Sequence, residues 1–264
     1  MKLMLLALWR YRHFVLASIK SDLKGRYARS RLGMLWHVLN PLAQAAIFAL
    51  ILSEVIGARL PGVEDKSAYA VYLMAGTAAW GLFSEIVTRS THIFIEYANV
   101  MKKITFPRIC LPVIVGGSAL LNHVLLLLAI FFVFLFFGRV PGGAVLALPV
   151  GVVLIALFGF GLGVLLGIFN VFSRDVSQVL NVGLQIWFWL TPIVYPANVI
   201  PEHMRWALQV NPMAPLVQVY QQAMLYGQWP QWSTLIVPFS CAVVLCLLTL
   251  FIFVRANADL VDAL

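Results

Sequence analysis

Charged side chains are scarce in this chain of 264 residues: they make up 11% of it, and acidic residues number only ten. Soluble domains carry about 25% charged residues and roughly half apolar ones. Here 62% of the residues are hydrophobic, and the mean hydropathy is +0.94. This composition excludes an ordinary water-soluble fold and predicts that a lipid bilayer surrounds most of the chain.

Catalytic and metal-binding motifs are also missing from the sequence. It has no GxSxG, HExxH or paired-carboxylate motif, and its three cysteines, Cys110, Cys241 and Cys246, fall in or beside apolar runs without CxxC spacing. A G-x-x-x-x-G-K-[ST] loop for nucleotide phosphates is absent as well. We therefore expect no enzymatic activity, no metal and no bound cofactor. Any ATP and Mg²⁺ would belong to a separate subunit.

Basic residues are more frequent than acidic ones and give a net charge of +8. Four of them, Lys24, Arg26, Arg29 and Arg31, directly precede a long apolar run. A nucleic-acid-binding protein would spread its basic residues over one face of a soluble fold, so this arrangement disfavours nucleic acid as a partner. Cations beside a span stay on the cytoplasmic side and favour anionic lipids. These four residues either guide an anionic lipid headgroup or only set the topology, and the sequence leaves both hypotheses open.

Residues 1–31 combine apolar positions with a basic stripe formed by Lys2, Arg10, His13, Lys20 and Lys24. This pattern predicts an amphipathic helix in the cytoplasmic membrane interface. No small-residue cleavage site follows the short apolar stretch at the N-terminus, so we expect an uncleaved helix rather than a signal peptide.

Six apolar runs have the length and composition of membrane spans, and together they predict one all-α integral membrane domain covering residues 1–264. They are residues 33–56, 67–87, 110–137, 144–172, 176–195 and 233–254. With this order, 14 of the 18 lysine and arginine residues fall on the side that holds both termini. The excess predicts cytoplasmic termini.

A few polar groups fall inside these runs. Glu85 and Arg89 are four residues apart and can pair on one helical face, either as a structural pair or as a functional one. Asn122 and His123 lie in the third run. Four glycines in the fourth run predict close helix packing rather than a phosphate site. They are Gly159, Gly161, Gly163 and Gly167.

Aromatic residues crowd the second half of the chain. Trp187, Trp189 and Tyr195 lie in the fifth run and are candidate channel-lining residues, because flat rings stack on the apolar faces of sugars. The two tryptophans are two positions apart and cannot share a helical face, so at most one of them faces a channel. Trp229 and Trp232 fit an aromatic belt at the membrane interface better.

Three blocks resemble a known family: LKGRYARSRLGMLWHVLNPL from Leu23, NVMKKITFPRICLPV from Asn99, and FNVFSRDVSQVLNVGLQIWFWLTPIVYP from Phe169. The third continues into VNPMAPLVQVYQQAMLYG. The chain resembles the membrane subunit of ABC-2 type exporters that move O-antigen, capsular polysaccharide or teichoic acid, and the resemblance spans nearly the whole chain.

The resemblance implies a homodimer in the bacterial cytoplasmic membrane that carries two ATPase subunits and exports a glycan on a polyprenyl pyrophosphate lipid. It implies a cytoplasmic coupling helix at residues 91–103 and a re-entrant gate region at residues 196–232. Coupling residues would be Ile93, Phe94, Glu96, Tyr97, Arg174 and Asp175. Outer-gate residues would be Trp206, Asn211, Pro212 and Tyr220.

Three other functions compete with glycan export. An ABC-2 exporter of drugs or small lipids would have the same architecture. A membrane-embedded glycosyl or acyl transferase would need acidic or histidine clusters that the sequence lacks, and a passive channel would need a selectivity motif. Glycan export is therefore the preferred interpretation.

Overall fold

The computed structural model describes residues 8–27, 33–36, 66–103, 106–136 and 142–256, with single positions 6, 39, 43 and 47. These residues form helices joined by turns and short loops, with no strand among them. Four of the described helices are long and apolar enough to cross a membrane. The described part of the chain is thus helical, with helices apolar enough for a membrane, as the composition predicts.

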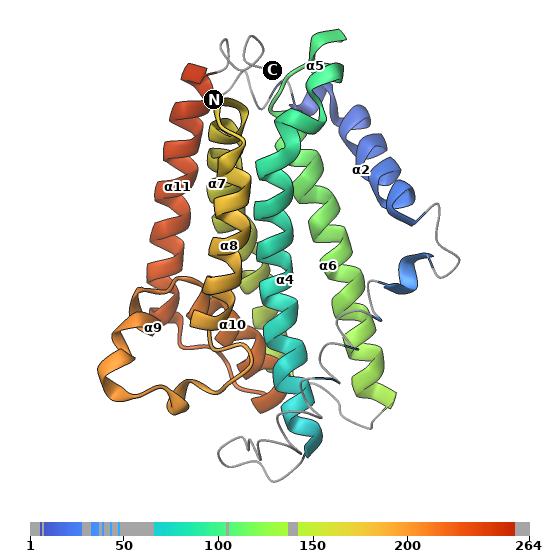
Figure 1. Cartoon of the computed structure of the whole chain (residues 1–264). Helices are drawn as coiled ribbons and strands as arrows, with labels where there is room; N and C mark the ends of the chain where they lie inside the picture. The colour runs from blue at the N-terminus through green and yellow to red at the C-terminus, as the bar shows by residue number, and fades with distance from the viewer. Residues whose placement is uncertain are drawn as a thin grey trace.

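Three long helices form the centre of the bundle: α4 (Lys66–Glu96), α6 (Cys110–Phe136) and α7 (Leu148–Phe172). They run in alternating directions, so the end of α4 and the start of α6 lie at the same end of the molecule as α5 (Ala98–Lys103) (Figure 1). We call this the inner end and the opposite one the outer end. A short 3-10 helix, Gly143–Ala147, leads into α7 at the outer end.

Glycines bring α7 into backbone contact with α4, as the sequence predicts. A Cβ at Gly163 would lie 2.9 Å from the Cα of Val87, and one at Gly167 would lie 2.5 Å from the carbonyl oxygen of Ser90. Only a residue without a side chain fits so close to a neighbouring backbone. The glycines of α7 are therefore packing residues.

Two further helices lie against this centre. Helix α8 (Asp175–Leu190) follows a tight turn after α7, and α11 (Ile236–Ala256) packs along α7, where a Cβ at Gly161 would lie 2.9 Å from Leu245 Cβ. Both helices are labelled beside α7 in Figure 1. The outer face of α11 is largely apolar and exposed, as expected for a helix that faces lipid or a membrane partner. The exposed side of α8 mixes apolar side chains with Gln178, Asn181 and Gln185.

The segment between α8 and α11 folds back at the outer end in several short pieces. These include α9 (Trp206–Val210), α10 (Met213–Gln221) and a π-helical turn, Gln222–Tyr226. The turn ends at Gly227, whose φ of 61° is in the left-handed region that favours glycine. Helix α10 is mostly buried and contacts α4 and α7.

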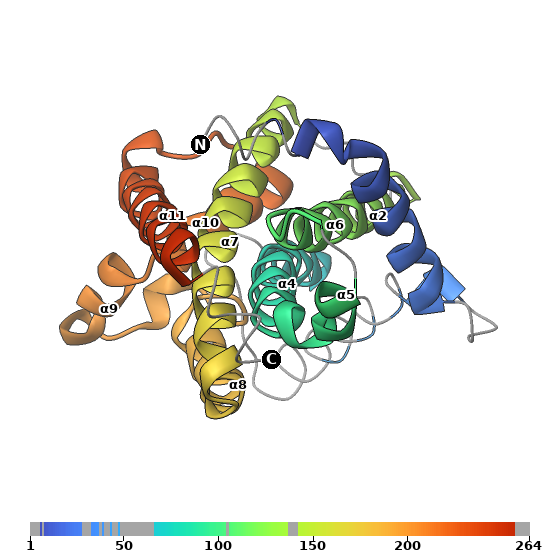
Figure 2. The same ribbon diagram turned by 90° about the horizontal axis from the view of Figure 1, so that it is seen from above.

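Helix α2 (Arg12–Tyr27) lies at the edge of the bundle beside α6 (Figure 2). Its apolar side buries Val15 and Ile19 against Cys110 and Ile114 of α6. The basic side chains of Lys20 and Lys24 are exposed. The amphipathic pattern of the N-terminal segment thus has a structural basis: one side packs on the protein and the other stays free.

Helix boundaries agree with the sequence in some spans and differ in others. Helices α6, α7 and α11 lie within a few residues of the predicted ranges, and α8 ends five residues early. Most of the first predicted span, 33–56, lies outside the described residues, apart from the 3-10 turn Gly33–Leu35 and single positions.

The second span differs most, because α4 continues nine residues beyond the predicted end at residue 87. Of its polar residues there, Thr91 Oγ1 donates a hydrogen bond of 2.9 Å to the Val87 carbonyl. The buried Ser90 packs against Gly163, and its hydroxyl has no hydrogen-bond partner among the described residues. The predicted coupling helix 91–103 is therefore divided, with residues 91–96 in α4 and the remainder mostly in α5.

Candidate functional site

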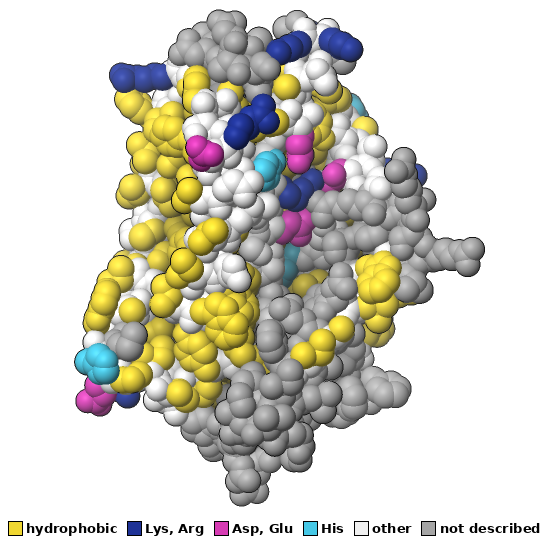
Figure 3. Space-filling model, in the orientation of Figure 1, with side chains coloured by type: hydrophobic (Ala, Val, Ile, Leu, Met, Phe, Trp, Pro, Cys, Tyr) yellow, Lys and Arg dark blue, Asp and Glu magenta, His cyan; other side chains and the backbone are white. Residues whose placement is uncertain are grey.

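A chain of polar contacts joins α2, α4 and α6 toward the inner end. Arg89 Nη2 lies 2.7 Å from Asp22 Oδ2, and Arg89 Nη1 lies 3.6 Å from Glu85 Oε1. Asn122 Nδ2 donates a hydrogen bond of 3.0 Å to Glu85 Oε1. Figure 3 shows basic and acidic side chains gathered on this part of the surface. The predicted pair of Glu85 and Arg89 is confirmed, and the structure adds two partners to it.

These ionic groups are only partly exposed, at 22–24% of their side-chain surface. Charges in such positions are costly in an apolar environment unless they are paired, which makes the network a candidate functional element. Burial raises the pKa of the nearby Tyr97 hydroxyl; the Asp22 carboxylate adds to this shift and Arg89 opposes it. The charges of the network therefore influence Tyr97, which lies at the junction of α4 and α5.

Sequence reasoning missed Asp22 and the role of Asn122. Asp22 is the one acidic residue in a basic helix, and Asn122 is a polar residue within an apolar run. A lone acidic residue in a basic helix and a polar residue in an apolar run are both signals of a functional or paired group. What the sequence lacked was the packing of α2 on α6, which brings residues 67 positions apart into contact.

The predicted coupling residues on α4 divide into two groups. Ile93 and Phe94 are fully buried inside the chain, where Phe94 contacts Phe253 of α11 with ring centroids 6.1 Å apart. They are therefore core residues of this structure and not an exposed plug for a partner. Glu96 is exposed, and Tyr97 is half-buried.

The other predicted coupling residues lie at the inner end. Arg174 and Asp175 are exposed where α7 turns into α8, and Asp175 occupies the first turn of α8. Lys102 and Lys103 end α5 and are exposed too. Figure 1 places the start of α8 and helix α5 at the same end of the bundle. This end therefore presents charged groups of both signs.

The four candidate headgroup residues can be followed only in part. Lys24 is exposed on α2, and the backbone of Arg26 belongs to the same helix. The side chain of Arg26, and the whole of Arg29 and Arg31, lie outside the described residues.

Trp187 of α8 belongs to an aromatic cluster between α4, α7 and α8. Its ring lies 5.2 Å from that of Phe83 and 6.0 Å from that of Phe158, measured between centroids, and Phe83 and Phe158 are stacked at 5.4 Å. This cluster packs inside one chain. Trp187 is thus engaged with its own helices, whereas Trp189 is 54% exposed and remains the better candidate for a channel surface.

Asn211 joins the end of α8 to the start of α10. It accepts hydrogen bonds at Oδ1 from Trp187 Nε1 (2.8 Å) and from the backbone N–H of Met213 (3.0 Å), and its Nδ2 donates to Thr191 Oγ1 (3.0 Å). A second contact of Nδ2 reaches the Leu190 carbonyl at 3.3 Å. One nearly buried amide therefore fixes the outer segment to the bundle.

The remaining outer-gate residues lie in different environments. Tyr220 of α10 is fully buried, with its hydroxyl 2.8 Å from Nε2 of His123 on α6. Trp206 is 65% exposed, and Pro212 is the N-cap of α10. The Tyr195 hydroxyl donates to the Trp189 carbonyl at 2.6 Å. The structure brings Asn211, Pro212 and Trp187 together, while Trp206 stays apart at the surface.

Among the residues that the structure describes, no three histidine, cysteine, aspartate or glutamate side chains gather as metal ligands. Other buried polar groups join helices in pairs: Asn170 Nδ2 donates to the Thr91 carbonyl, and Thr249 Oγ1 donates to the Gly161 carbonyl.

The family model described as "ABC-2 type transporter" matches residues 13–225. The chain is 34% identical over 214 residues to an O-antigen export system permease protein RfbA of Klebsiella pneumoniae, covering 78% of each protein. It is 28% identical to a protein of the same name from Myxococcus xanthus, covering 90% of each, and 22% identical to the polysialic acid transport protein KpsM of Escherichia coli, covering 78% of this chain and 79% of that protein. The match includes α2, the polar network and α10.

Proposed function

This chain belongs to the ABC-2 type transporter family, and from that premise we propose that it is the membrane subunit of an ATP-driven polysaccharide exporter. Its substrate is a glycan of the O-antigen type, carried on a polyprenyl pyrophosphate lipid across the bacterial cytoplasmic membrane. The ATPase is a separate subunit, which supplies ATP and Mg²⁺.

The observation that carries this proposal is the extent of the similarity. Relatives named for O-antigen export align with 78–90% of the chain. The family match continues from α2 through the segment that contains α10. Because both ends of the bundle fall within the match, the similarity covers more than a generic set of apolar spans.

The inner end is the proposed docking surface for the ATPase. Its exposed charged groups, on α5 and at the start of α8, suit a partner that binds and releases with its nucleotide state. Because Ile93 and Phe94 are core residues, we assign direct contact to Glu96, Arg174 and Asp175. The contact between Asp22 and Arg89 links α2 to α4, the helix that also carries Glu96. A movement of α4 would therefore shift α2 as well.

The finer features of the proposal are a homodimer with two ATPase subunits, six spans in each chain, and cytoplasmic termini. The charge asymmetry of the sequence supports the orientation. The exposed apolar side chains of α8 support a membrane partner, and Val179, Val182 and Ile186 are among them. Lys24 and its basic neighbours would meet the pyrophosphate headgroup on the cytoplasmic side.

Copurification tests the proposal. The full chain is expressed with the ATPase encoded beside it, reconstituted in nanodiscs, and assayed for ATP hydrolysis with and without polyprenyl-linked glycan. We expect a stable complex whose hydrolysis rises with the lipid-linked glycan and not with small hydrophobic drugs.

A response to drugs or short lipids alone would favour the small-molecule exporter of the same family. A chain that purifies without any ATPase would contradict the proposal. A charge-preserving variant, Arg26→Lys with Arg29→Lys and Arg31→Lys, tests the headgroup residues. Normal insertion with a reduced glycan response supports headgroup recognition, and an unchanged response leaves these residues a topological role.

A further inference from the structure

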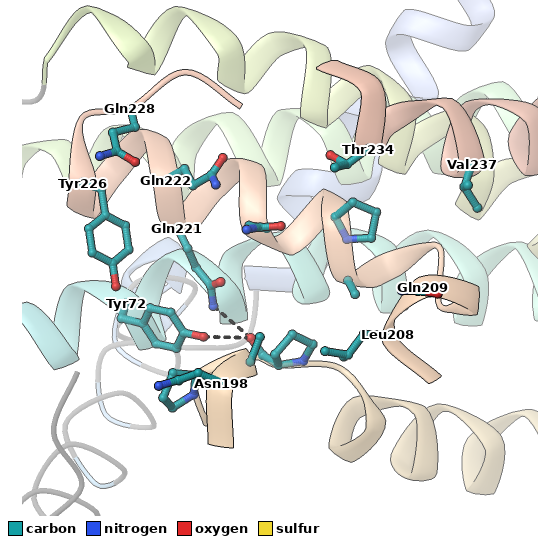
Figure 4. Close-up of a pocket in the computed structure, with 16 residues that line it drawn as sticks. Tyr72, Asn198, Leu208, Gln209, Gln221, Gln222, Tyr226, Gln228, Thr234 and Val237 are labelled. Atoms are coloured by element: carbon teal, nitrogen blue, oxygen red, sulfur yellow. Dashed lines mark hydrogen bonds between the residues drawn. The ribbon is translucent and has the colours of Figure 1, made fainter. Parts of the chain in front are cut away.

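A pocket of about 710 Å³ opens at the outer end of the chain. Its walls come from α9, α10, the start of α11 and the segment after α8 (Figure 4). The volume is within the range of small-molecule sites, about 300–1,000 Å³. The outer segment therefore encloses a space of its own, separate from the polar network near the inner end.

The back of the pocket is held in place by one carbonyl group. Pro192 accepts a hydrogen bond of 3.1 Å from the Tyr72 hydroxyl and another of 3.0 Å from Gln221 Nε2. The Tyr195 carbonyl oxygen lies 3.0 Å from the same hydroxyl, so the two carbonyls share its single hydrogen. Figure 4 shows both contacts converging on the same oxygen. The back wall is thus fixed before anything binds.

The rest of the lining is rich in side-chain amides. Gln209, Gln218 and Gln228 are exposed, and Gln222 is half-buried. Each amide carries both donors and an acceptor, as hydroxyl groups do, so the two groups can pair in either direction. The ring of Tyr226 is 40% exposed beside them and offers an aromatic face.

Charge is absent from this lining, which contains no lysine, arginine, histidine, aspartate or glutamate among the residues described. Burial raises the pKa of the Tyr226 hydroxyl above its ordinary value, so this group is neutral at physiological pH. An ionised ligand would find no partner for its charge there. A neutral molecule with many hydroxyl groups would find several partners.

We propose that this pocket is a carbohydrate-binding site that takes uncharged sugar residues of the glycan at the outer end of the exporter. The inference rests on the proposed function and extends it, because it names the substrate class: a glycan that presents neutral, hydroxyl-rich sugars to this chain. Gln218 and Gln222 hydrogen-bond the hydroxyls, and the Tyr226 ring contacts an apolar sugar face.

Saturation-transfer NMR on the intact complex in nanodiscs tests the site, with maltotriose as the neutral probe and trigalacturonic acid as the acidic one. We expect maltotriose to bind and trigalacturonic acid to bind at least about tenfold more weakly. The double variant Gln218→Leu with Gln222→Leu should weaken maltotriose binding by about tenfold or more, since two amide partners are lost. Gln231→Leu is the matched control, because Gln231 is exposed at the same end and is not part of the lining.

Unchanged maltotriose binding in the double variant would overturn the inference, and so would equal or tighter binding of the acidic probe. Absence of binding of both probes to the wild-type complex would overturn it as well. ATP hydrolysis with lipid-linked glycan is measured on the same samples. Stimulated hydrolysis without pocket binding refutes the pocket alone, whereas the absence of stimulation refutes the export function. Thermal unfolding of the variants confirms that they remain folded.

Discussion

The two ends of α4 are held by different kinds of contact. Toward its inner end, α4 meets charged and amide partners on other helices, through Arg89 and Glu85. Toward its outer end, the hydroxyls of Tyr69 and Tyr72 donate to backbone carbonyls of residues 192–195. One helix therefore combines an ionic attachment with a neutral one.

The difference separates two requirements of an exporter. Ionic contacts that are about a quarter exposed respond to salt and to a charged partner. Neutral hydrogen bonds to backbone carbonyls respond to neither, and they keep a binding surface in shape while the charge state elsewhere changes. We therefore expect the contacts at the inner end, and not those at the outer end, to depend on salt and on charge.

Filling the contact between α4 and α7 should have the largest effect. Gly167→Ala places a Cβ 2.5 Å from the Ser90 carbonyl oxygen, so the helices must separate. We expect a loss of about 3 kcal/mol in the free energy of unfolding, measured by SDS titration of the purified chain. Gly183→Ala on α8 meets no atom within 4 Å and is the control, with a gain of up to about 1 kcal/mol. Equal effects of the two changes would contradict the close contact.

The second largest effect is expected from removing the Asn211 side chain, which joins the end of α8 to the start of α10. Asn211→Ala leaves the indole N–H of Trp187 and the backbone N–H of Met213 without their acceptor, and should cost about 2 kcal/mol. The same titration measures it, and Trp187 fluorescence reports the local change. Asn181→Ala, at an exposed position of α8, should change stability by less than about 0.5 kcal/mol. A stable Asn211→Ala variant with unaltered fluorescence would show that Asn211 does not fix the outer segment to the bundle.

The ionic attachment is tested by Arg89→Gln, which should cost about 1.5 kcal/mol at low salt. The cost should shrink at 1 M salt, where the screening length falls to about 3 Å. Arg205→Gln is the control, since its pair with Glu202 is 3.5 Å long and more than half exposed on both sides. That change should matter by less than about 0.5 kcal/mol. If the stability loss of Arg89→Gln is the same at low and high salt, the contact at the inner end is not ionic in character, and the proposed difference between the two ends is wrong.

The smallest effect is expected for Tyr72→Phe, because Pro192 keeps its second hydrogen bond from Gln221. We expect a loss of about 1 kcal/mol that is the same at low and high salt. The pair of titrations, Tyr72→Phe beside Arg89→Gln, compares the two ends directly. A salt-dependent loss for Tyr72→Phe would erase the distinction between them.

The sequence predicted the helices whose boundaries are set by composition. The apolar runs 110–137, 144–172 and 233–254 end at polar or proline-rich segments, and α6, α7 and α11 follow them closely. It also predicted glycine packing in α7, since small residues have few other uses inside a membrane helix.

The remaining features depend on contacts between distant segments. Helix α4 extends past residue 87 because Thr91 bonds to its own helix and to α7, and Ser90 packs against Gly163 of α7; no local pattern reveals these contacts. The acceptor for Arg89 in α2 and the glutamine-lined pocket are likewise products of tertiary packing. For the same reason Ile93 and Phe94, which the resemblance implies as coupling residues, are core residues in the fold.

The length of α4 has a mechanical consequence. With 31 residues it is about 46 Å long at 1.5 Å per residue, against about 30 Å of bilayer core. A pivot at Val87, where Gly163 meets the helix, would divide this rod unequally and would leave Tyr72 about 22 Å away. A tilt of about 5° would move Tyr72 by about 2 Å, enough to break a hydrogen bond of 3.1 Å to Pro192. A push on the short arm of α4 would thus loosen the wall of the sugar pocket at the far end of the long arm.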